Sequence, residues 1–576
     1  MTNKAQIVVL KFGSSVLRSE KDLPSAVHEI YRWWREGAQV LAVVSAFGDT
    51  TDQLLRRAEN VHDQPDKSAL ATLLATGEAA SSALLALALN KVGISARLVD
   101  EVQAKLRTVS GSTDAIPVSV DAAYLRRESQ RAVIVFPGFV GRDETGNRTI
   151  LGRGGSDLTA LFLAQQLKAK CVLVKDVDGL YTSDPACHTV RASRFEQASY
   201  DTALRLGGPV VQAKAVRFAA QNKLRFTITR VGAPKESEIG PFADRLDGSG
   251  SSREPLRVAL LGCGTVGGGV YERLAALPDL FTITGVGTRT GLRARAAGVP
   301  DDLAIDDLEA LVEKPCDVVL ELIGGTKRAA SLIEQALRLG RNVVSANKAL
   351  IANSHQAFEA LAHENGSSLR YSAAVGGVLP ALETVKRVRV DGPLKGFSGV
   401  LNGTCNFVLD QLSGGGTLGG AVRLAQEEGY AEEHPQLDLE GIDAAQKLVL
   451  LTRAAFDVSL PIHSIACKGI QDINAKTLRA ARERGRTVRL VIDCQNQSGR
   501  INASVAPVEL PFNHPLAAVT GVGNRLIVEP ELGEPIIVSG PGAGRWPTTE
   551  SVMADLFELR RQNPAEESEK AEACVA

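Results

Sequence analysis

Short runs rich in Val and Ile alternate with Ala- and Leu-rich stretches, and this alternation occurs twice in a chain of 576 residues. The first series contains IVVLKFG, VLAVVSAF, AVIVFPGF, CVLVKDV and RFTITR, and the second contains RVALLGCG, FTITGVGT, DVVLELIG and NVVSANK. Continuous apolar runs of this length are typical of strands that are buried on both faces of a parallel sheet. The sequence therefore predicts two successive α/β units with helices between the strands.

A polar segment at residues 232–255, GAPKESEIGPFADRLDGSGSSREP, separates the two series. Its Gly, Ser and Pro content predicts a flexible linker. After about residue 370 the pattern is more mixed, and the final polar residues are typical of disorder. We therefore expect an α/β sandwich over residues 1–231, a linker over 232–255, a second α/β domain over 256–370, an α+β domain over 371–560 and a polar tail over 561–576.

Composition narrows the class of partner. Lys and Arg total 65 and Asp and Glu total 66, for a net charge of −1, so we expect no nucleic acid or anionic membrane as partner. Eight cysteines without C-x-x-C spacing argue against a zinc site and indicate reduced thiols in the cytoplasm. We find no apolar run of about 18 residues and no signal peptide, so we expect no membrane span.

Three segments of the first half combine glycine with charge after a strand: KFGSS, LGRGGSD and KDVDGLYTSDP. A glycine-rich turn that enters a helix presents backbone N–H groups to an anion. Lys11 and Arg153 would add positive charge, and Asp157 would hold Mg²⁺ or orient a lysine. Singly, such a lysine is more often only solvated, and such a glycine cluster is more often an ordinary turn. Together they indicate a phosphoryl-transfer site without a Walker A motif.

In this order, with VVSAFGDTTDQLL, ATGEAASSALL and PGFVGRD, the segments resemble the aspartokinases of the amino-acid kinase family over about residues 6–231. The resemblance implies an αβα sandwich that phosphorylates L-aspartate with ATP and Mg²⁺. Lys11 would neutralise the transferred phosphoryl group, Arg153 would bind the α-carboxylate and Glu78 the ammonium group. The residues expected around aspartate are Ser45, Thr51, Glu78, Phe139, Arg153, Ser156 and Asp157, and those expected to face ATP are Gly13, Lys175, Asp176, Tyr181, Asp184 and Lys214.

The segment RVALLGCGTVGGGV has the order strand, G-x-G-x-x-G and helix that dinucleotide binding requires. The next strand ends at Thr288 and Arg289 without the acidic residue that would bind both ribose hydroxyls of NAD. An Arg at this position favours a 2′-phosphate, so we expect NADP(H) in preference to NAD(H), unless Arg289 only faces solvent. The predicted domain is a Rossmann NAD(P)-binding domain.

DVVLELIGG, VVSANKALIA, SGVLNGTCNFVL, EEGYAEEHPQLDLEGIDAAQKL and GPGAGRWPTTESVMADL resemble homoserine dehydrogenases over about residues 256–557. Asp443 and Lys447 lie on one helical face, and the pattern alone indicates a surface ion pair. The resemblance implies that Lys447 donates a proton to the new alkoxide, that Asp443 orients it or the substrate, and that Lys348 is a second cation that also binds substrate. Glu432, Asp438, Gly403 and Thr404 would bind the amino-acid end, and Gly262, Gly264, Thr265, Val266, Gly267, Arg289, Gly324 and Asn347 the cofactor.

Two positions depart from the family pattern. His434 stands where the family usually has an acidic residue, and Ser372 stands where many members have a Glu that supports a monovalent cation. Backbone carbonyls around Val375 and Gly377 would bind Na⁺ only weakly, so no metal ligand is predicted.

The combined resemblance is to the bifunctional aspartokinase–homoserine dehydrogenases of threonine, methionine and lysine biosynthesis. The alternative is one active half with the other as a binding or assembly module. Members usually carry ACT regulatory modules between the halves, but residues 232–255 are too few for a module of roughly 60 to 80 residues. We therefore expect no ACT-mediated feedback, independent movement of the halves, and a dimer or tetramer.

Overall fold

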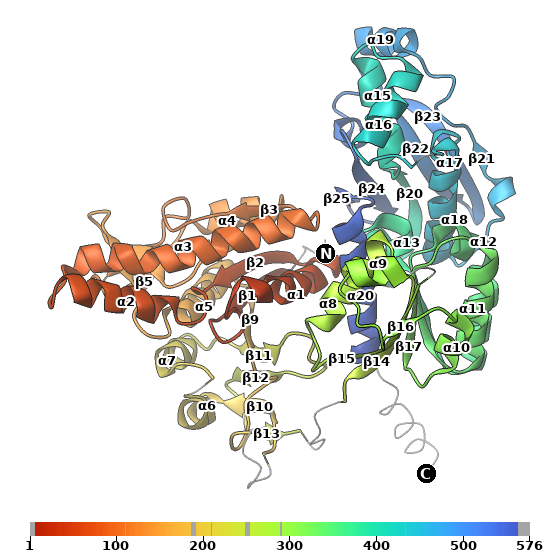
Figure 1. The fold of residues 1–576 in the computed structure, drawn as a ribbon. Helices are drawn as coiled ribbons and strands as arrows, with labels where there is room; N and C mark the ends of the chain where they lie inside the picture. Colours follow the sequence, from red (N-terminus) through yellow and green to blue (C-terminus); the bar gives the residue numbers. More distant parts are fainter. Residues whose placement is uncertain are drawn as a thin grey trace. The chain divides into compact units, whose positions relative to one another are not determined.

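A computed structural model describes residues 6–109, 111–185, 192–208, 210–247, 254–288, 291–432 and 434–562. The chain divides into two compact units, one that ends at about residue 253 and one over residues 254–559 (Figure 1). The final residues from 563 onward, most of the predicted polar tail, lie outside the described residues.

The first unit is built on a nine-stranded sheet in the order β13-β10-β12-β11-β9-β1-β2-β6-β3. Its centre consists of the five predicted strands, which pair in parallel because each is apolar on both faces. These are β1 (Ile7–Phe12), β2 (Gln39–Val44), β6 (Val133–Pro137), β9 (Lys170–Lys175) and β11 (Phe226–Arg230), with β3 (Ala96–Leu98) and β10 (Phe195–Ser199) farther out.

Helices cover both faces of this sheet (Figure 1). On one face, α1 (Leu23–Arg35) and α3 (Lys67–Lys91) pack against each other and against β2, β3 and β6. On the other, α5 (Gly155–Leu167) packs on β1 and β9 and against α7 (Ala213–Gln221). The unit also contains α2 (Thr50–Val61), α4 (Ala122–Ser129), α6 (Tyr200–Leu206) and a small sheet of β5 (Ile116–Ser119), β4 (Arg107–Val109), β7 (Val140–Arg142) and β8 (Arg148–Ile150).

Helix α3 is apolar over most of its length. Among the described residues it is the one helix whose length and mean hydropathy of 1.5 would allow it to cross a membrane, which our search for apolar runs missed. Half of that apolar window is buried inside the protein. A core helix that is apolar on several sides passes the same test.

The predicted linker is partly wrong. Within residues 232–255 the structure contains β12 (Ser237–Gly240), which pairs with β10 and β11, and β13 (Arg245–Leu246), which pairs with β10. The strands were missed because they are short and polar: β12 has only four residues, of which Ser237, Ile239 and Gly240 are buried, and the two residues of the edge strand β13 are exposed. Residues 248–253 lie outside the described residues.

The second unit begins with a six-stranded parallel sheet in the order β16-β15-β14-β17-β18-β19. Relative to chain order this is 3-2-1-4-5-6, the order of dinucleotide-binding folds, in which ligands bind beyond the carboxyl ends of the strands. The strands are β14 (Leu256–Leu261), β15 (Phe281–Gly287), β16 (Ala304–Ile305), β17 (Val318–Glu321), β18 (Asn342–Ser345) and β19 (Leu369–Arg370). Its helices are α8 (Thr265–Ala275), α9 (Gly291–Ala296), α10 (Leu308–Glu313), α11 (Lys327–Arg338) and α12 (Lys348–Glu364).

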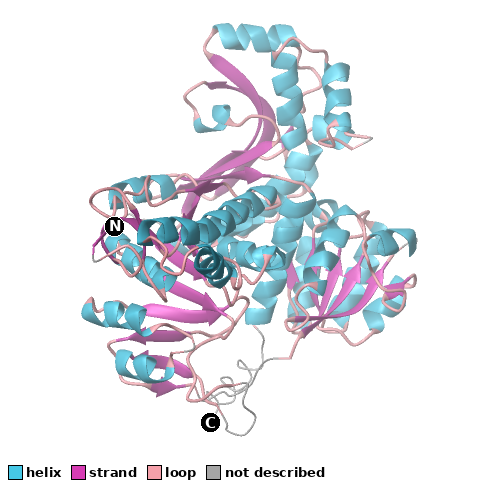
Figure 2. Ribbon diagram, turned by 60° about the vertical axis from the view of Figure 1, so that its left-hand side comes forward, coloured by secondary structure: helices cyan, strands magenta, loops and turns pink. Residues whose placement is uncertain are grey.

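A second six-stranded sheet follows, in the order β21-β23-β22-β20-β24-β25 and mainly antiparallel (Figure 2). Helix α20 (Arg545–Arg561) then returns to the first sheet of this unit, where Phe557 meets Phe281 edge to face. The strands are β20 (Leu394–Val400), β21 (Ala466–Cys467), β22 (Arg486–Gln497), β23 (Arg500–Pro511), β24 (Gly523–Pro530) and β25 (Ile536–Pro541). The helices are α13 (Ser372–Gly376), α14 (Ala381–Asp391), α15 (Gly403–Ser413), α16 (Leu418–Glu427), α17 (Gln436–Leu439), α18 (Ile442–Phe456) and α19 (Ala475–Glu483).

Candidate active sites

In the first unit, one carboxylate holds two lysines at the carboxyl ends of adjacent strands. Asp157 lies in the first turn of α5, Lys11 near the end of β1 and Lys175 at the end of β9. Asp157 Oδ1 is 2.7 Å from Lys11 Nζ, and Asp157 Oδ2 is 2.9 Å from Lys175 Nζ. All three side chains are buried. Of the two roles considered for Asp157, orientation of lysine fits this geometry, because both of its oxygens are used.

The cluster shifts the pKa values of its members. Burial alone would raise the pKa of Asp157, but the two ammonium groups lower it to about 2. Burial and the neighbouring Lys175 lower the pKa of Lys11 to about 8, although Asp157 opposes the shift. The three groups carry a net charge of +1 at neutral pH, which suits a phosphoryl group.

Glycines make room around this cluster. A Cβ on Gly13 would lie 2.8 Å from Lys11 Nζ, so the absence of a side chain lets the ammonium group lie over the backbone. Gly154 adopts a φ of +78° at the N-cap of α5, a conformation that glycine adopts without strain. The free N–H groups of the first turn of α5 therefore lie beside Asp157.

Glu78 on α3 is a second buried acidic group. Its Oε1 accepts a hydrogen bond from the backbone N–H of Ala46 at 3.3 Å, whereas its Oε2 has no hydrogen-bond partner in the described part of the chain. Burial raises the pKa of Glu78 to about 7. A ligand with an ammonium group would satisfy both the free oxygen and the charge.

The other predicted substrate residues follow the same strand ends. Ser45 follows β2, and its carbonyl oxygen accepts from the hydroxyl of Ser81 on α3. Phe139 follows β6 with a φ of +70°, and Ser156 is buried beside Gly138. Thr51 lies half-buried on α2 and Arg153 is exposed before α5.

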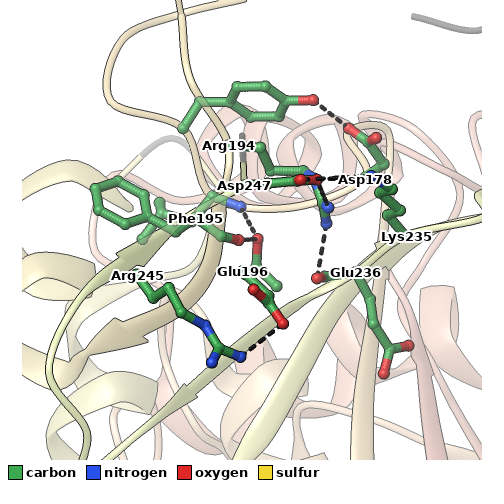
Figure 3. A network of polar contacts seen from close by, with 11 residues as sticks. Asp178, Arg194, Phe195, Glu196, Lys235, Glu236, Arg245 and Asp247 are labelled. Atoms are coloured by element: carbon green, nitrogen blue, oxygen red, sulfur yellow. Dashed lines mark hydrogen bonds and ion pairs between the residues drawn. The ribbon is translucent and has the colours of Figure 1, made fainter. Parts of the chain in front are cut away.

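The predicted nucleotide loop is held from the edge of the sheet (Figure 3). Tyr181 donates to Asp178 Oδ1 at 2.6 Å and pairs with Arg194 in an isolated bridge. Arg194 donates to the carbonyl oxygen of Glu236 at 2.7 Å and forms a buried ion pair with Asp247. Sequence reasoning missed Arg194 and Asp247, because nothing local links residues that meet only through β10, β12 and β13.

The three remaining residues predicted to face ATP lie in different surroundings. Asp176 and Asp184 are exposed on the loop after β9. Lys214 at the start of α7 donates to Asp114 Oδ1 at 2.6 Å and to the carbonyl oxygen of Leu151 at 2.8 Å, next to the glycine-rich turn. A cavity of ≈ 430 Å³ lies beside the network of Arg194 and Asp247. Its lining consists of Arg194, Glu196, Gln197, Lys235, Glu236, Glu238 and Asp247.

In the second unit, the turn between β14 and α8 has the close contacts that glycine allows. A Cβ on Gly267 would lie 1.9 Å from the carbonyl oxygen of Gly262, and one on Gly262 would lie 2.6 Å from that of Leu322. A Cβ on Gly264, the N-cap of α8 before Thr265 and Val266, would meet nothing within 4 Å. The turn thus keeps an open face at the helix N-terminus, where a pyrophosphate binds. Arg289 lies outside the described residues.

The substrate side of this unit repeats the carboxylate between two lysines. Asp443 Oδ1 is 2.5 Å from Lys348 Nζ, and Asp443 Oδ2 is 2.9 Å from Lys447 Nζ. Lys447 also donates to the carbonyl oxygen of Leu401 at 2.6 Å. Asp443 and Lys447 are buried, whereas the side chain of Lys348 is 44% exposed. Asp443 therefore orients both lysines instead of forming a surface pair.

Charges in this cluster also shift pKa values. Burial would raise the pKa of Asp443, but the two lysines hold it well below its usual range. Burial would lower the pKa of Lys348, yet Asp443, Asp438 and Glu432 raise it. Burial and the like charge of Asp443 raise the pKa of Asp438.

Asn402 joins the two acidic residues and was missed from the sequence. Its Nδ2 lies 2.7 Å from Asp438 Oδ1 and 2.9 Å from Asp443 Oδ2, while its Oδ1 caps α15 by accepting from Cys405 N. The N-cap position before Gly403 was the available signal.

The remaining predicted residues lie around this cluster or beside it. Thr404 donates to the carbonyl oxygen of Tyr430 at 2.7 Å, and Asn347 donates to that of Gly325, the residue after Gly324. Glu432 and His434 are exposed. Ser372 begins α13, and its N–H donates to Asp555 Oδ2 at 3.0 Å.

Possible metal ligands and cysteines were also located among the described residues. No group of three or more His, Cys, Asp or Glu among them is arranged to hold a metal ion. The six cysteines that the structure describes are free.

Comparison with known proteins agrees with this division. Family models match residues 6–230 (amino acid kinase family), 262–372 (homoserine dehydrogenase, NAD binding domain) and 380–557 (homoserine dehydrogenase). The homoserine dehydrogenase of Corynebacterium glutamicum is 35% identical over 320 residues, 53% of this chain and 72% of that protein. That of Bacillus subtilis is 33% identical over 316 residues, 53% of this chain and 73% of that protein.

A solved structure supports the same family. The crystal structure of a homoserine dehydrogenase from Thiobacillus denitrificans is 31% identical with a TM-score of 0.51, and the match covers 54% of this chain and 74% of that chain. These matches confirm the predicted fold class and the predicted fusion of a kinase with a dehydrogenase. The chain therefore belongs to the homoserine dehydrogenase family and carries an amino acid kinase domain before its NAD-binding domain.

Proposed function

We propose that the first unit phosphorylates L-aspartate with ATP to give 4-phospho-L-aspartate, and that the second unit reduces L-aspartate 4-semialdehyde to L-homoserine. The two reactions flank a reduction that would belong to another enzyme. The observation that carries the proposal is the pair of clusters in which Asp157 and Asp443 each hold two lysines over a nucleotide-binding edge. The products would feed threonine, methionine and lysine biosynthesis.

In the kinase reaction, the β-carboxylate of aspartate attacks the γ-phosphoryl group of ATP, and ADP leaves. This carboxylate is already ionised near pH 7, so the site needs alignment and charge neutralisation more than a strong base. Lys11 and Lys175, fixed by Asp157, would neutralise charge on the transferred group. Glu78 would bind the ammonium group of aspartate and Arg153 its α-carboxylate.

Mg²⁺ would enter this site with the nucleotide. Asp157 pairs each of its oxygens with an ammonium group, so we assign it to the orientation of Lys11 and Lys175 in preference to the metal. Asp176 and Asp184 on the loop after β9 are exposed and suit a metal held mainly by phosphate oxygens.

In the dehydrogenase reaction, the bound nicotinamide cofactor supplies or accepts the hydride. During reduction the carbonyl carbon of the semialdehyde gains the hydride and its oxygen gains a proton. Lys447, held by Asp443 and the carbonyl oxygen of Leu401, would give that proton to the developing alkoxide. Lys348 would bind the substrate carboxylate, while Asp438 and Glu432 would bind its ammonium group.

The cofactor of the dehydrogenase is a nicotinamide dinucleotide, and NADP(H) is the preferred form that we propose. The second strand of the fold, β15, ends at Gly287, and the sequence that follows, Thr288 and Arg289, has no acidic residue for the two ribose hydroxyls. A homo-oligomer, dimer or tetramer, located in the cytoplasm is part of the same proposal, and light scattering at micromolar concentration measures the assembly.

Purified protein tests both activities. We expect ATP-dependent formation of aspartyl hydroxamate and homoserine-dependent reduction of NADP⁺. Lys447→Ala should abolish the redox activity and leave hydroxamate formation unchanged. The proposal fails if the wild-type protein has neither activity, and redox activity that is absent before the substitution would leave only the kinase.

A further inference from the structure

Glu321 is a buried carboxyl group at the carboxyl end of β17, on the edge of the sheet where the cofactor binds. It is completely buried and lies opposite Ser345 at the end of the neighbouring strand β18. No Lys or Arg of the described ranges forms an ion pair with it. Burial raises the pKa of Glu321, while hydrogen bonds from Ser345 and from backbone N–H groups oppose the shift.

The hydrogen bonds of Glu321 reach both loops at this edge. Its Oε1 accepts from the N–H of Ile323 at 3.1 Å, and its Oε2 accepts from the hydroxyl of Ser345 at 2.7 Å. Ser345 Oγ in turn accepts from the backbone N–H of Asn347 at 3.1 Å. One carboxyl group therefore fixes the start of the loop after β17 and the turn between β18 and α12.

Asn347 connects these two loops to the start of α12. Its Nδ2 donates to the carbonyl oxygen of Gly325 at 2.7 Å, and its Oδ1 accepts from the N–H of Leu350 at 3.2 Å as the N-cap of the helix. Lys348 is the first residue of that helix. Its ammonium group then reaches Asp443 at 2.5 Å.

We propose that Glu321 is a positioning residue for the dehydrogenase reaction: through Ser345 and Asn347 it fixes the helix start from which Lys348 reaches Asp443 and the substrate. This inference rests on the dehydrogenase activity proposed above. The side chain of Lys348 is 44% exposed and its ammonium group pairs with Asp443, so the backbone at the start of α12 sets the point from which it reaches that carboxylate.

The positioning role also explains why a polar group occupies this strand position. The rest of β17 is apolar and buried, and an apolar side chain would avoid the free-energy cost of burying a carboxyl group. A carboxyl group offers two acceptor oxygens, which a hydrophobic side chain cannot, and both are used here.

The experiment compares Glu321→Gln and Ser345→Ala with Asp317→Asn in the full chain. Asp317 precedes the same strand at its opposite end, where it pairs with Arg257, so its substitution makes the same carboxylate-to-amide change away from the site. The measurements are kcat, KM for homoserine and the pH profile of homoserine oxidation. Kinase activity and thermal unfolding of each preparation report whether the protein is folded.

We expect Glu321→Gln and Ser345→Ala to lower kcat by about 10-fold or more, because small displacements of a catalytic constellation cost factors of this size. A Lys348 that lies farther from Asp443 has a lower pKa, so the alkaline limb of the profile should move to lower pH. Asp317→Asn and the kinase activity should stay within about twofold of wild type, within the range of surface changes.

An unchanged kcat and pH profile in both test variants would overturn the inference, as would an equal loss in Asp317→Asn. If Glu321→Gln does not fold, Ser345→Thr decides, because it keeps the hydroxyl: rescue relative to Ser345→Ala supports the relay, and equal loss refutes it. A wild-type protein without homoserine-dependent NADP⁺ reduction would instead refute the proposed function, and this inference with it.

Discussion

At the residue scale, each unit places one buried carboxylate between two lysines. Asp157 and Asp443 come from the first turn of a helix, and in each cluster at least one lysine is buried with the acid. A carboxylate between two ammonium groups leaves a net charge of +1 and fixes both cations without loss of the positive field. Each cluster therefore suits the anionic substrate that we propose for it.

The first prediction concerns the charge of Asp157. Asp157→Asn leaves Lys11 and Lys175 facing each other without an anion, so the pKa of Lys11 should fall below its present value of about 8. We expect the kinase kcat to drop on the order of 10²- to 10³-fold at pH 7.5, since preorganised charge is the main catalytic element. The pH profile of hydroxamate formation checks this.

Asp114→Asn is the matched control, because Asp114 pairs with Lys214 outside the Asp157 cluster. Asp114→Asn should change the KM for ATP and should leave the alkaline limb of the pH profile of hydroxamate formation largely in place. A kinase with full activity in Asp157→Asn would contradict the role given to the cluster.

The second prediction concerns Glu78, whose pKa burial raises from 4.5 to about 7. A raised carboxyl pKa means that the folded state binds the proton more tightly, so stability is full below pH 4.5 and is lost as pH rises through about 7. Glu78→Gln removes this loss. We expect the variant to raise the free energy of unfolding at pH 8 by up to about 3 kcal/mol and to give no gain at pH 4.5.

The same residue should link aspartate binding to pH. The ammonium group of aspartate needs the ionised form of Glu78, so the KM for aspartate should rise as pH falls below about 7. Glu78→Gln should bind aspartate weakly at every pH. A KM for aspartate that stays constant from about pH 5.5 to about pH 8, a range on the order of two units around neutrality, would contradict this link between binding and pH.

Residue types alone identified part of these sites. Lys11 and Asp157 stand in glycine-rich charged segments that a local pattern detects, whereas the pattern of Asp443 and Lys447 alone indicated a surface ion pair, and their proposed roles came from the family resemblance. The bonds that Asn402 makes to Asp438 and Asp443 depend on tertiary packing, so its sequence position revealed only a helix cap. The use of Asp157 by two lysines likewise depends on the parallel order of the strands.

At the element scale, prediction succeeded where an element is buried on both sides. Strands β1, β9 and β14 are largely apolar runs, a pattern that is typical of strands covered on both faces of a parallel sheet. Strands β12 and β13 failed this test: β12 is only four residues long and pairs with β10 and β11 on both sides, and β13 is a two-residue edge strand that pairs only with β10. The composition of residues 232–255 predicted a linker, but part of this segment forms strands because its backbone pairs with neighbouring strands.

The third prediction separates folding from binding in the turn before α8. Gly267→Ala would force a Cβ to within 1.9 Å of a carbonyl oxygen, so it should lower the unfolding temperature of the second unit and abolish its activity. Gly264→Ala meets no protein atom within 4 Å and should fold normally. Its methyl group faces the open side of the turn, so the KM for NADP⁺ should rise on the order of 10-fold.

Thermal unfolding and steady-state kinetics of both variants check this prediction, with kinase activity as the internal control. Equal stability of Gly267→Ala and wild type would show that the close contact is relieved at no cost. An unchanged KM in Gly264→Ala would mean that the cofactor does not approach this face.

At the scale of the whole molecule, the two units have separate hydrophobic cores and separate sheets. Each unit contains its own charged cluster, and the proposed function gives each unit its own nucleotide site. The residues proposed for each reaction all come from one unit. We accordingly expect substitutions in either cluster to act on one activity alone.

The last prediction concerns feedback. The family models leave residues 231–261 between the kinase and NAD-binding matches, and this interval contains β12, β13 and all of β14. A separate regulatory module of roughly 60 to 80 residues does not fit there.

We expect threonine and lysine at about 10 mM to leave the kinase rate at saturating aspartate unchanged. This concentration is far above the roughly micromolar-to-millimolar range in which metabolite sites bind. Rates measured at saturating and at limiting aspartate distinguish competition at the aspartate site from inhibition through a second site. An amino acid can occupy the Glu78 pocket and compete weakly with aspartate, but this competition disappears at saturating aspartate. Inhibition by sub-millimolar threonine that persists at saturating aspartate would require a second binding site and would contradict the absence of feedback through this segment.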